Sequence, residues 1–289
     1  MPRNLKMRKK VFYLLVYDKS GIVKYEVNDP KKDLLFKSDS SNLYLAIDKK
    51  TGKTGFLRFP RDRLGNADMQ LEVEKLKFLA ETSETIESEY KKLIGNPDAC
   101  VHYDWLFPEL TGSVICNESQ LNRQVNFLTA KDAELKDFFP LPRLTSRYKV
   151  DTRTGAWILG RFYKLQTFAD TIRISFKFYP DQVIIEPKMH RMIYLGWNLK
   201  DTDEPRQNIM QMARVILSFI KPGDSDEDKE FIQILELMAK EGHKGGHYAH
   251  AWLYQIIKKL WGHKYHPFTY LDEETGLWRS LTDAEILNI

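Results

Sequence analysis

The spacing of apolar residues changes along this 289-residue chain, and this change limits the possible folds more than any single motif does. In the first third, short apolar segments alternate with polar residues between turn-forming residues, which predicts strands. In residues 201–289, apolar residues recur at helical spacing. Strands followed by helices predict an α+β fold with a β-rich N-terminal part, a central antiparallel meander and a helical C-terminal bundle.

The N-terminal third contains a clear hairpin pattern. Residues 43–47 and 54–59 are β-prone, and Asp48-Lys-Lys-Thr-Gly52 joins them with a Gly-containing turn. A long helix is expected next, because Asn66 can cap it and apolar residues follow at roughly helical spacing. Gly95-Asn-Pro97 is expected to end this helix.

The central region is expected to form the antiparallel meander. The candidate strands are residues 156–165, 171–179, 182–186 and 191–199. Their short connections favour antiparallel pairing over parallel strands joined by helices. In the second strand, apolar residues alternate with Arg173, Ser175 and Lys177, so one face is expected to be buried and the other to carry cations.

The last part of the chain is expected to contain three helices and a short fourth one. They start near Pro205, after the capping residue Ser225, near His247 and after Thr282. The expected division is a β-rich region with one long helix, a basic antiparallel sheet and a helical region, at 1–140, 141–200 and 201–289. The last two are also compatible with one continuous domain.

Composition indicates an intracellular globular protein. Hydrophobic residues make up 43% and charged residues 29%, which are ordinary values for this class. No apolar run approaches the ~18–20 residues of a membrane span, and the basic start lacks a cleavage pattern for a signal peptide. Cys100 and Cys116 form no metal-type pair, which favours a reducing compartment.

The net charge of +4 is unevenly distributed. Residues 1–10 carry five basic residues and no acid, and residues 143–200 carry 11 basic and 4 acidic residues, a net +7. The segments 11–142 and 201–289 are net −3 and −5. Concentrated positive charge attracts polyanions, although a plain solvated face explains the same pattern.

The preferred hypothesis is a non-enzymatic DNA- or RNA-binding protein, of the kind that suits a viral or mobile-element accessory factor. Its nucleic-acid-binding residues are expected on a basic N-terminal arm and on the basic sheet face with the loop before it. The candidates are Arg3, Lys6, Arg8, Lys9, Lys10, Arg143, Arg147, Lys149, Arg161, Lys164, Arg173 and Lys177. Cations and aromatic rings on a sheet suit single strands, because phosphates and base faces are both contacted.

A metal-dependent nuclease is the alternative. Asp170, a turn at Pro180 and Asp181, and Glu186-Pro-Lys188 form a pattern that resembles the PD-(D/E)XK nucleases over about twenty residues. The resemblance implies that Asp170 and Glu186 hold Mg²⁺ or Mn²⁺ and that Lys188 orients water or stabilises phosphate charge. Outside this alternative no cofactor is expected, and these residues can equally be solvated hairpin residues.

Other patterns leave the question of enzymatic activity open and favour a binding role. There is no glycine-rich phosphate loop, no His-Glu-x-x-His and no Gly-x-Ser-x-Gly motif. Five histidines cluster near the C-terminus, but glycines interrupt the helical spacing, so no metal ligands are assigned; they are His243, His247, His250, His263 and His266. A third hypothesis is a protein-interaction module in which the helical C-terminal region, rich in tryptophan at 252–261, contacts a partner. No membrane contact is expected.

Overall fold

The computed structural model describes residues 14–38, 40–116, 122–133, 135, 138–262, 266–272 and 275–280. Strands dominate the N-terminal part and helices the C-terminal part, so the predicted α+β class is confirmed. The chain forms two compact units, a sheet unit of residues 1–73 and 110–129 and a helical unit of residues 74–109 and 130–289. Each unit is described by itself, and the three-part division expected from composition stays a prediction.

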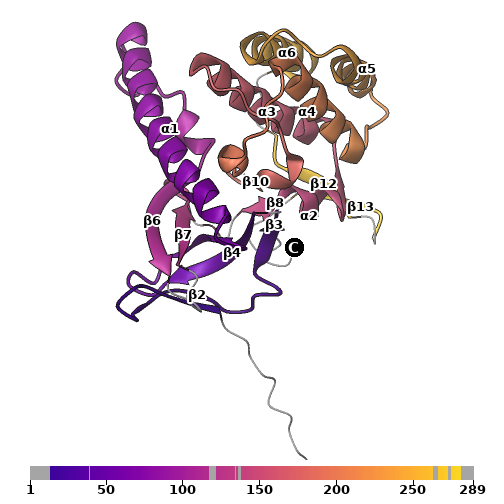
Figure 1. Cartoon of the computed structure of the whole chain (residues 1–289). Coiled ribbons are helices and arrows are strands. Elements are labelled where there is room, and N and C mark those ends of the chain that lie inside the picture. The colour runs from indigo at the N-terminus through magenta and orange to yellow at the C-terminus, as the bar shows by residue number, and fades with distance from the viewer. Residues whose placement is uncertain are drawn as a thin grey trace, which may run out of the picture. The chain divides into compact units, whose positions relative to one another are not determined.

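The sheet unit is a curled seven-stranded sheet in the order β1-β2-β4-β5-β7-β6, with β3 paired to β4 (Figure 1). Its strands are β1 (Leu14–Tyr17), β2 (Val23–Val27), β3 (Leu34–Lys37), β4 (Ser41–Asp48), β5 (Thr54–Pro60), β6 (Glu109–Cys116) and β7 (Arg123–Thr129). The predicted hairpin is confirmed as the antiparallel pair β4–β5. Tyr25 stacks on Phe127 at 4.6 Å between ring centroids, and Gly55 makes room for the Phe127 ring, because a side chain there would collide with it.

Helix α1 (Gly65–Ile94) follows the sheet strands, as predicted. Asn66 does not cap it, because Asp62 Oδ1 accepts a hydrogen bond from Gly65 N at 3.0 Å instead. Asn66 lies inside the first turn, where its side chain accepts from Gln124 N at 2.9 Å. The helix ends at Gly95, whose φ of 67° is easily adopted only by glycine.

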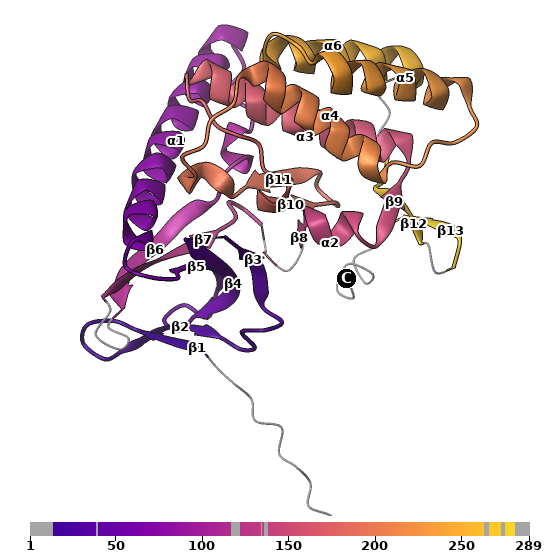
Figure 2. The same cartoon turned by 45° about the vertical axis from the view of Figure 1, so that its right-hand side comes forward.

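Within its described residues, the helical unit contains five further helices, three short 3₁₀ turns and two small sheets (Figure 2). The helices are α2 (Leu141–Thr145), α3 (Thr152–Thr171), α4 (Pro205–Phe219), α5 (Asp226–Glu241) and α6 (Gly246–Trp261). The 3₁₀ turns are η1 (Tyr103–Trp105), η3 (Pro180–Gln182) and η4 (Gly196–Asn198). One sheet joins β8 (Phe139–Pro140), β10 (Val183–Glu186) and β11 (Arg191–Tyr194), and the other joins β9 (Tyr148–Val150), β12 (Thr269–Asp272) and β13 (Leu277–Ser280).

The expected strand at 156–165 is wrong, because these residues lie inside α3. The helix starts at the N-cap Asp151, whose Oδ1 accepts from Thr154 N at 2.8 Å. It packs against α4 and α6, so most of its surface is buried and only a narrow face carries charged residues. Residues 172–179 are irregular, so the expected second strand is also wrong. The antiparallel pairing of β10 with β11 is the part of the central meander that is confirmed.

The three predicted C-terminal helices are confirmed. Pro205 opens α4, and Ser225 caps α5 by accepting a hydrogen bond from Asp228 N at 3.1 Å. Gly242, with a φ of 65°, ends α5, and α6 begins at Gly246. The expected helix after Thr282 lies outside the described residues.

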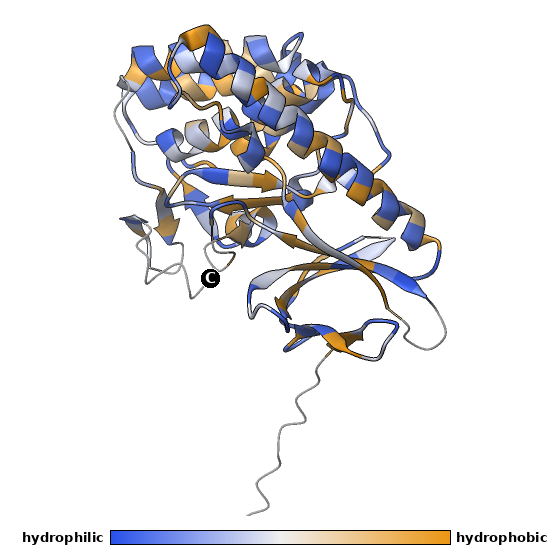
Figure 3. Ribbon diagram, turned by 90° about the vertical axis from the view of Figure 1, so that its left-hand side faces the viewer, coloured by the Kyte–Doolittle hydropathy of each residue, from blue (hydrophilic) through white to orange (hydrophobic). Residues whose placement is uncertain are grey.

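Hydrophilic and hydrophobic bands alternate along these helices (Figure 3), as expected for elements with one face in a core. Among the helices within the described residues, none combines the length and the apolar character needed to cross a bilayer.

Candidate anion-binding site

One face of α3 carries two cations between two aromatic residues. Trp157, Arg161, Lys164 and Phe168 follow one another at intervals of four, three and four residues, so they form one stripe along the helix. Arg161 and Lys164 are therefore one turn apart on the same face. Both are half-buried.

Aromatic contacts close both ends of this stripe. The indole of Trp157 packs against the imidazole of His190, with 4.5 Å between ring centroids. Phe168 stacks on Tyr103 at 4.9 Å, and the Lys164 ammonium lies 5.7 Å from the centroid of the same tyrosine ring. The stripe is thus bounded by η1 at one end and by the β10–β11 turn at the other.

The two cations have no anionic partner among the described residues. Arg161 Nε is buried and has no hydrogen-bond partner there. Two carboxylates influence the Lys164 charge from a distance, Asp104 and Glu87. Asp104 already forms an ion pair with Lys131 at 2.8 Å, and Glu87 accepts a hydrogen bond from Val101 N at 3.0 Å. Half-buried cations without a counter-charge are unfavourable in a folded protein.

This arrangement disfavours the charged form of both side chains. Burial lowers the pKa of Arg161, which nevertheless keeps its charge because guanidinium pKa values lie so high. Burial, together with the Arg161 guanidinium, lowers the pKa of Lys164 to about 8. A fraction of Lys164 is therefore a neutral amine near physiological pH.

Three histidines from three different segments face the same cations. His250 comes from α6, His190 from the β10–β11 turn and His102 from the segment before η1. Burial and the Lys164 and Arg161 charges lower the pKa of His250 to about 4. Burial and Arg161 lower the pKa of His190 to about 4, and burial and Lys164 lower that of His102. These imidazoles are uncharged at neutral pH. Arg161, Lys164, His102, His190 and His250 are together called the α3 cationic cluster, after the two residues that carry its positive charge.

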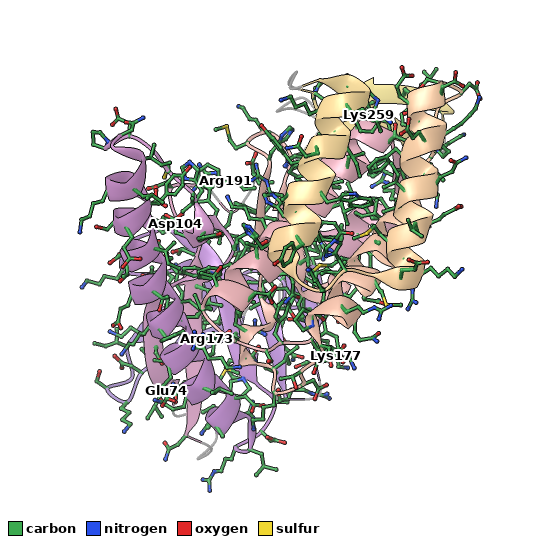
Figure 4. All side chains as sticks on the ribbon, turned by 90° about the horizontal axis from the view of Figure 1, so that it is seen from above. Glu74, Asp104, Arg173, Lys177, Arg191 and Lys259 are labelled. Atoms are coloured by element: carbon green, nitrogen blue, oxygen red, sulfur yellow. The ribbon has the colours of Figure 1, made fainter. Side chains whose placement is uncertain are left out.

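Two of these histidines, His102 and His190, and the nearby Asp132 have unusual backbone conformations. His102, Asp132 and His190 have φ values of 52°, 50° and 53°, in a region that residues other than glycine seldom adopt. Such conformations persist where surrounding contacts enforce them, often at functional sites. Here Arg191 provides some of these contacts, since its guanidinium lies 4.2 Å from the Trp105 ring centroid and donates to the Asp132 carbonyl at 3.0 Å. Asp104 and Arg191 mark this region in Figure 4.

The sequence-predicted nucleic-acid-binding residues are dispersed. Arg161 and Lys164 belong to the cluster, whereas Arg173 and Lys177 lie in another part of the helical unit, as Figure 4 shows by comparison with Arg191. The remaining described candidates lie on or after α2, where Arg143 and Arg147 are exposed and Lys149 donates to the Ser218 carbonyl at 3.0 Å. The arm residues Arg3, Lys6, Arg8, Lys9 and Lys10 lie outside the described residues.

The residues of the nuclease alternative have separate structural contacts. Asp170 Oδ2 accepts a hydrogen bond from Gly246 N at 2.7 Å and so provides a partner for a backbone N–H in the first turn of α6. Both carboxylate oxygens of Glu186 accept from Met189 N, at 3.0 and 2.9 Å, and Lys188 is exposed. Over the described residues, no group of three or more His, Cys, Asp or Glu side chains could hold a metal ion. A catalytic role for this trio with Mg²⁺ or Mn²⁺ stays a prediction.

The C-terminal histidines do not act as one group. His250 faces the cations of α3, whereas His266 Nε2 lies 2.6 Å from Asp151 Oδ2 at the start of that helix. His243 stacks against Tyr248 with 5.8 Å between ring centroids. His263 lies outside the described residues.

Sequence reasoning missed a second charged site, in the sheet unit. Arg58 Nε on β5 and Glu72 Oε1 on α1 are 2.8 Å apart, and their side chains are only 3% and 1% exposed. Asn126 Nδ2 donates to Glu72 Oε2 at 2.9 Å, and Ser113 Oγ lies 2.9 Å from Asn126 Oδ1. An arginine inside an otherwise apolar strand is the only sequence signal of this pair. The network is a closed structural unit, since its cation has an anion.

Similarity to known proteins is found among solved structures. No family model matches the chain. No curated protein matches it either. Among solved structures, a chain described as vaccinia related kinase 3 is similar, with 12% identity over 96% of this chain and 82% of that chain and a TM-score of 0.45.

The structure corrects the first functional hypothesis. The physical reason for the error is that the expected basic sheet does not exist. Arg161 and Lys164 are half-buried on α3 instead of projecting from adjacent strands. The prediction of a DNA- or RNA-binding protein is therefore wrong.

Proposed function

We propose that this protein binds a small anionic ligand, bearing phosphate or carboxylate groups, at the α3 cationic cluster. The observation that carries the proposal is that Arg161 and Lys164, one turn apart and half-buried, have no carboxylate partner among the described residues. A bound anion supplies the missing charge. Because it binds the folded state, it also stabilises that state.

The donor groups suit phosphate and carboxylate. A guanidinium presents a planar set of N–H donors that matches two oxygens at once, and an ammonium adds a mobile point charge. The neutral imidazole of His250 can donate one further N–H. Together these groups can contact several oxygens of one multivalent anion.

The dimensions of the site favour a small ligand. Trp157 and Phe168 close the two ends of the stripe, and eleven residues of α-helix separate them, about 16 Å along the axis. Arg161 and Lys164 are only ~4.5 Å apart along that axis. The ligand expected at these two cations is therefore compact.

Isothermal titration calorimetry tests the proposal, with inorganic phosphate, pyrophosphate and citrate as probes. The wild-type protein is expected to bind at least one of them. The double variant Arg161→Gln/Lys164→Gln should lose affinity by about tenfold or more, because two charge-assisted contacts disappear. Arg173→Gln/Lys177→Gln is the matched control, since it removes two cations elsewhere in the same unit and should bind like wild type.

Either of two results rejects the proposal. One is that none of the three anions binds at millimolar concentration. The other is that the Arg161→Gln/Lys164→Gln protein, shown to be folded by circular dichroism, binds as tightly as wild type.

A further inference from the structure

We infer that Lys164 is a reactive amine that condenses with the carbonyl group of an anionic aldehyde or 2-oxo acid held at the α3 cationic cluster. This inference deepens the proposed function and rests on it for the orientation of the ligand. It assigns a chemical class of ligand and a covalent step to a site of known position.

The geometry sets Lys164 apart from surface lysines. Its ammonium lies 5.7 Å from the Tyr103 ring centroid, its side chain is half-buried, and Arg161 is one turn away on the same helix face. No carboxylate among the described residues forms an ion pair with it. A lysine desolvated beside a second cation is the arrangement that produces nucleophilic amines in enzymes.

The local electrostatics increase the reactive form. Burial and the Arg161 charge lower the pKa of Lys164 to about 8. At pH 7.5 about a quarter of this amine is then neutral, against about one part in a thousand for an ordinary lysine. The nucleophilic fraction is therefore enriched on the order of a few hundredfold.

The step needs no oxidant or reductant. The lone pair of the neutral amine attacks the carbonyl carbon, a C–N bond forms, and the carbonyl π pair moves to oxygen, which takes up the proton that the nitrogen releases. The hydroxyl group of the resulting carbinolamine takes up one proton from solvent and leaves as water, while the nitrogen lone pair forms the C=N bond. The resulting iminium carries one positive charge, as the ammonium did, so the anionic group of the ligand pairs with it in the same way.

Lys75 on α1 provides an internal comparison. Its side chain is also half-buried, and burial lowers its pKa. Its ammonium, however, donates to the Leu199 carbonyl at 3.3 Å. Since this hydrogen bond occupies Lys75, it controls for burial without the neighbouring arginine.

Reductive trapping tests the inference in the full-length protein. Pyridoxal 5′-phosphate and pyridoxal serve as probes, because only the first carries phosphate; their concentrations are compared as free aldehyde, since pyridoxal also closes to an internal hemiacetal. After borohydride reduction, peptide mass spectrometry is expected to find Lys164 as the first lysine modified, with pyridoxal 5′-phosphate effective at about tenfold lower concentration than pyridoxal. Pyruvate and glyoxylate are two further probes that carry a carboxylate in place of phosphate. Pyruvate represents the 2-oxo acids, and glyoxylate represents the anionic aldehydes.

Three variants separate the contributions of Lys164, Lys75 and Arg161 to formation of the adduct. Lys164→Met should abolish the adduct, and Lys75→Met should leave it unchanged. Arg161→Gln should bring pyridoxal 5′-phosphate down to the level of pyridoxal, because the anion loses its guanidinium partner.

The outcomes distinguish this inference from the proposed function. Modification spread over exposed lysines without enrichment at Lys164 overturns the inference, even if calorimetry shows phosphate binding. Equal modification of Lys164 by pyridoxal and by its phosphate also overturns it as stated. Absence of anion binding in calorimetry, with Lys164 still modified preferentially, rejects the proposed function alone.

Discussion

Replacing Lys164 by methionine should stabilise the folded protein at pH 7. Methionine keeps most of the apolar side-chain volume and removes an ammonium that is half-buried and lacks an ion-pair partner among the described residues. Most substitutions destabilise a protein, so a gain in the free energy of unfolding is an unusual expectation. It follows only if the Lys164 charge is uncompensated.

The size of the gain follows from the lowered pKa of Lys164. A pKa lowered from 10.5 to about 8 corresponds to about 3 kcal/mol, at 1.36 kcal/mol per pKa unit. The side chain is partly exposed, and solvent screens its charge, so a gain of about 1–2 kcal/mol is expected.

The pH dependence of the gain provides a second check. The folded-state pKa lies below the unfolded-state pKa, so the unfolded state binds more protons between pH 8 and 10.5. The free-energy cost of the Lys164 charge in the folded state is full below pH 8 and is lost as the pH rises to 10.5. At pH 10 the advantage of Lys164→Met should fall to about a quarter of its pH 7 value.

Urea denaturation at pH 7 and pH 10 measures both quantities. Lys177→Met is the control, because its ammonium lies near the Tyr179 ring in another part of the helical unit, and a change within about 0.5 kcal/mol is expected. A Lys164→Met protein that is less stable than wild type at pH 7 refutes the reasoning, because it shows that the ammonium has a stabilising partner.

Three further predictions concern other described sites. Glu72→Gln should destabilise the sheet unit by about 3–5 kcal/mol, since it leaves Arg58 buried without an anion; an unchanged urea midpoint contradicts this. Ser225→Ala should cost about 1 kcal/mol in thermal unfolding, because α5 loses its N-cap hydrogen bond, and an unchanged melting temperature contradicts that role. Stability should fall as the pH drops from 6.5 to 4, because unfolded histidines bind protons that His190 and His250 do not, and a His190→Asn/His250→Asn protein should show a flatter profile by pH-dependent denaturation.

Local signals were sufficient for the hairpin and for the C-terminal helices. Ser225 can satisfy the first N–H groups of a helix, and Gly242 can adopt the positive φ that ends it, wherever they occur in a sequence. The β4–β5 hairpin likewise depends on a short glycine-containing connection. These elements were predictable because each depends on residues that are adjacent in the chain.

Helix α3 was not predictable in this way, because tertiary burial leaves it only a narrow polar face. Its residues pack against α4 and α6, so apolar side chains cover most of its circumference and a period of 3.6 is hard to distinguish from a strand. The candidate site was missed for a related reason. Arg161 and Lys164 were identified as cations, but His102 and His190 reach them from distant segments that carry no motif.

A comparison of Arg58 with Arg161 supports the proposal that the α3 cationic cluster is a binding site. Arg58 has Glu72 at 2.8 Å, and Asn126 fixes the other carboxylate oxygen, so this cation is neutralised within the fold. Arg161 lies near Lys164 and near histidines whose pKa is lowered by burial and by the Arg161 charge, and no carboxylate among the described residues pairs with it. Breaking a structural ion pair destabilises a protein. Removing one of two neighbouring ligand-binding cations, in the absence of ligand, instead relieves the repulsion between them. Glu72→Gln is therefore expected to lower the free energy of unfolding and Lys164→Met to raise it. Such opposite changes would distinguish a charge that stabilises the fold from a charge that binds a ligand.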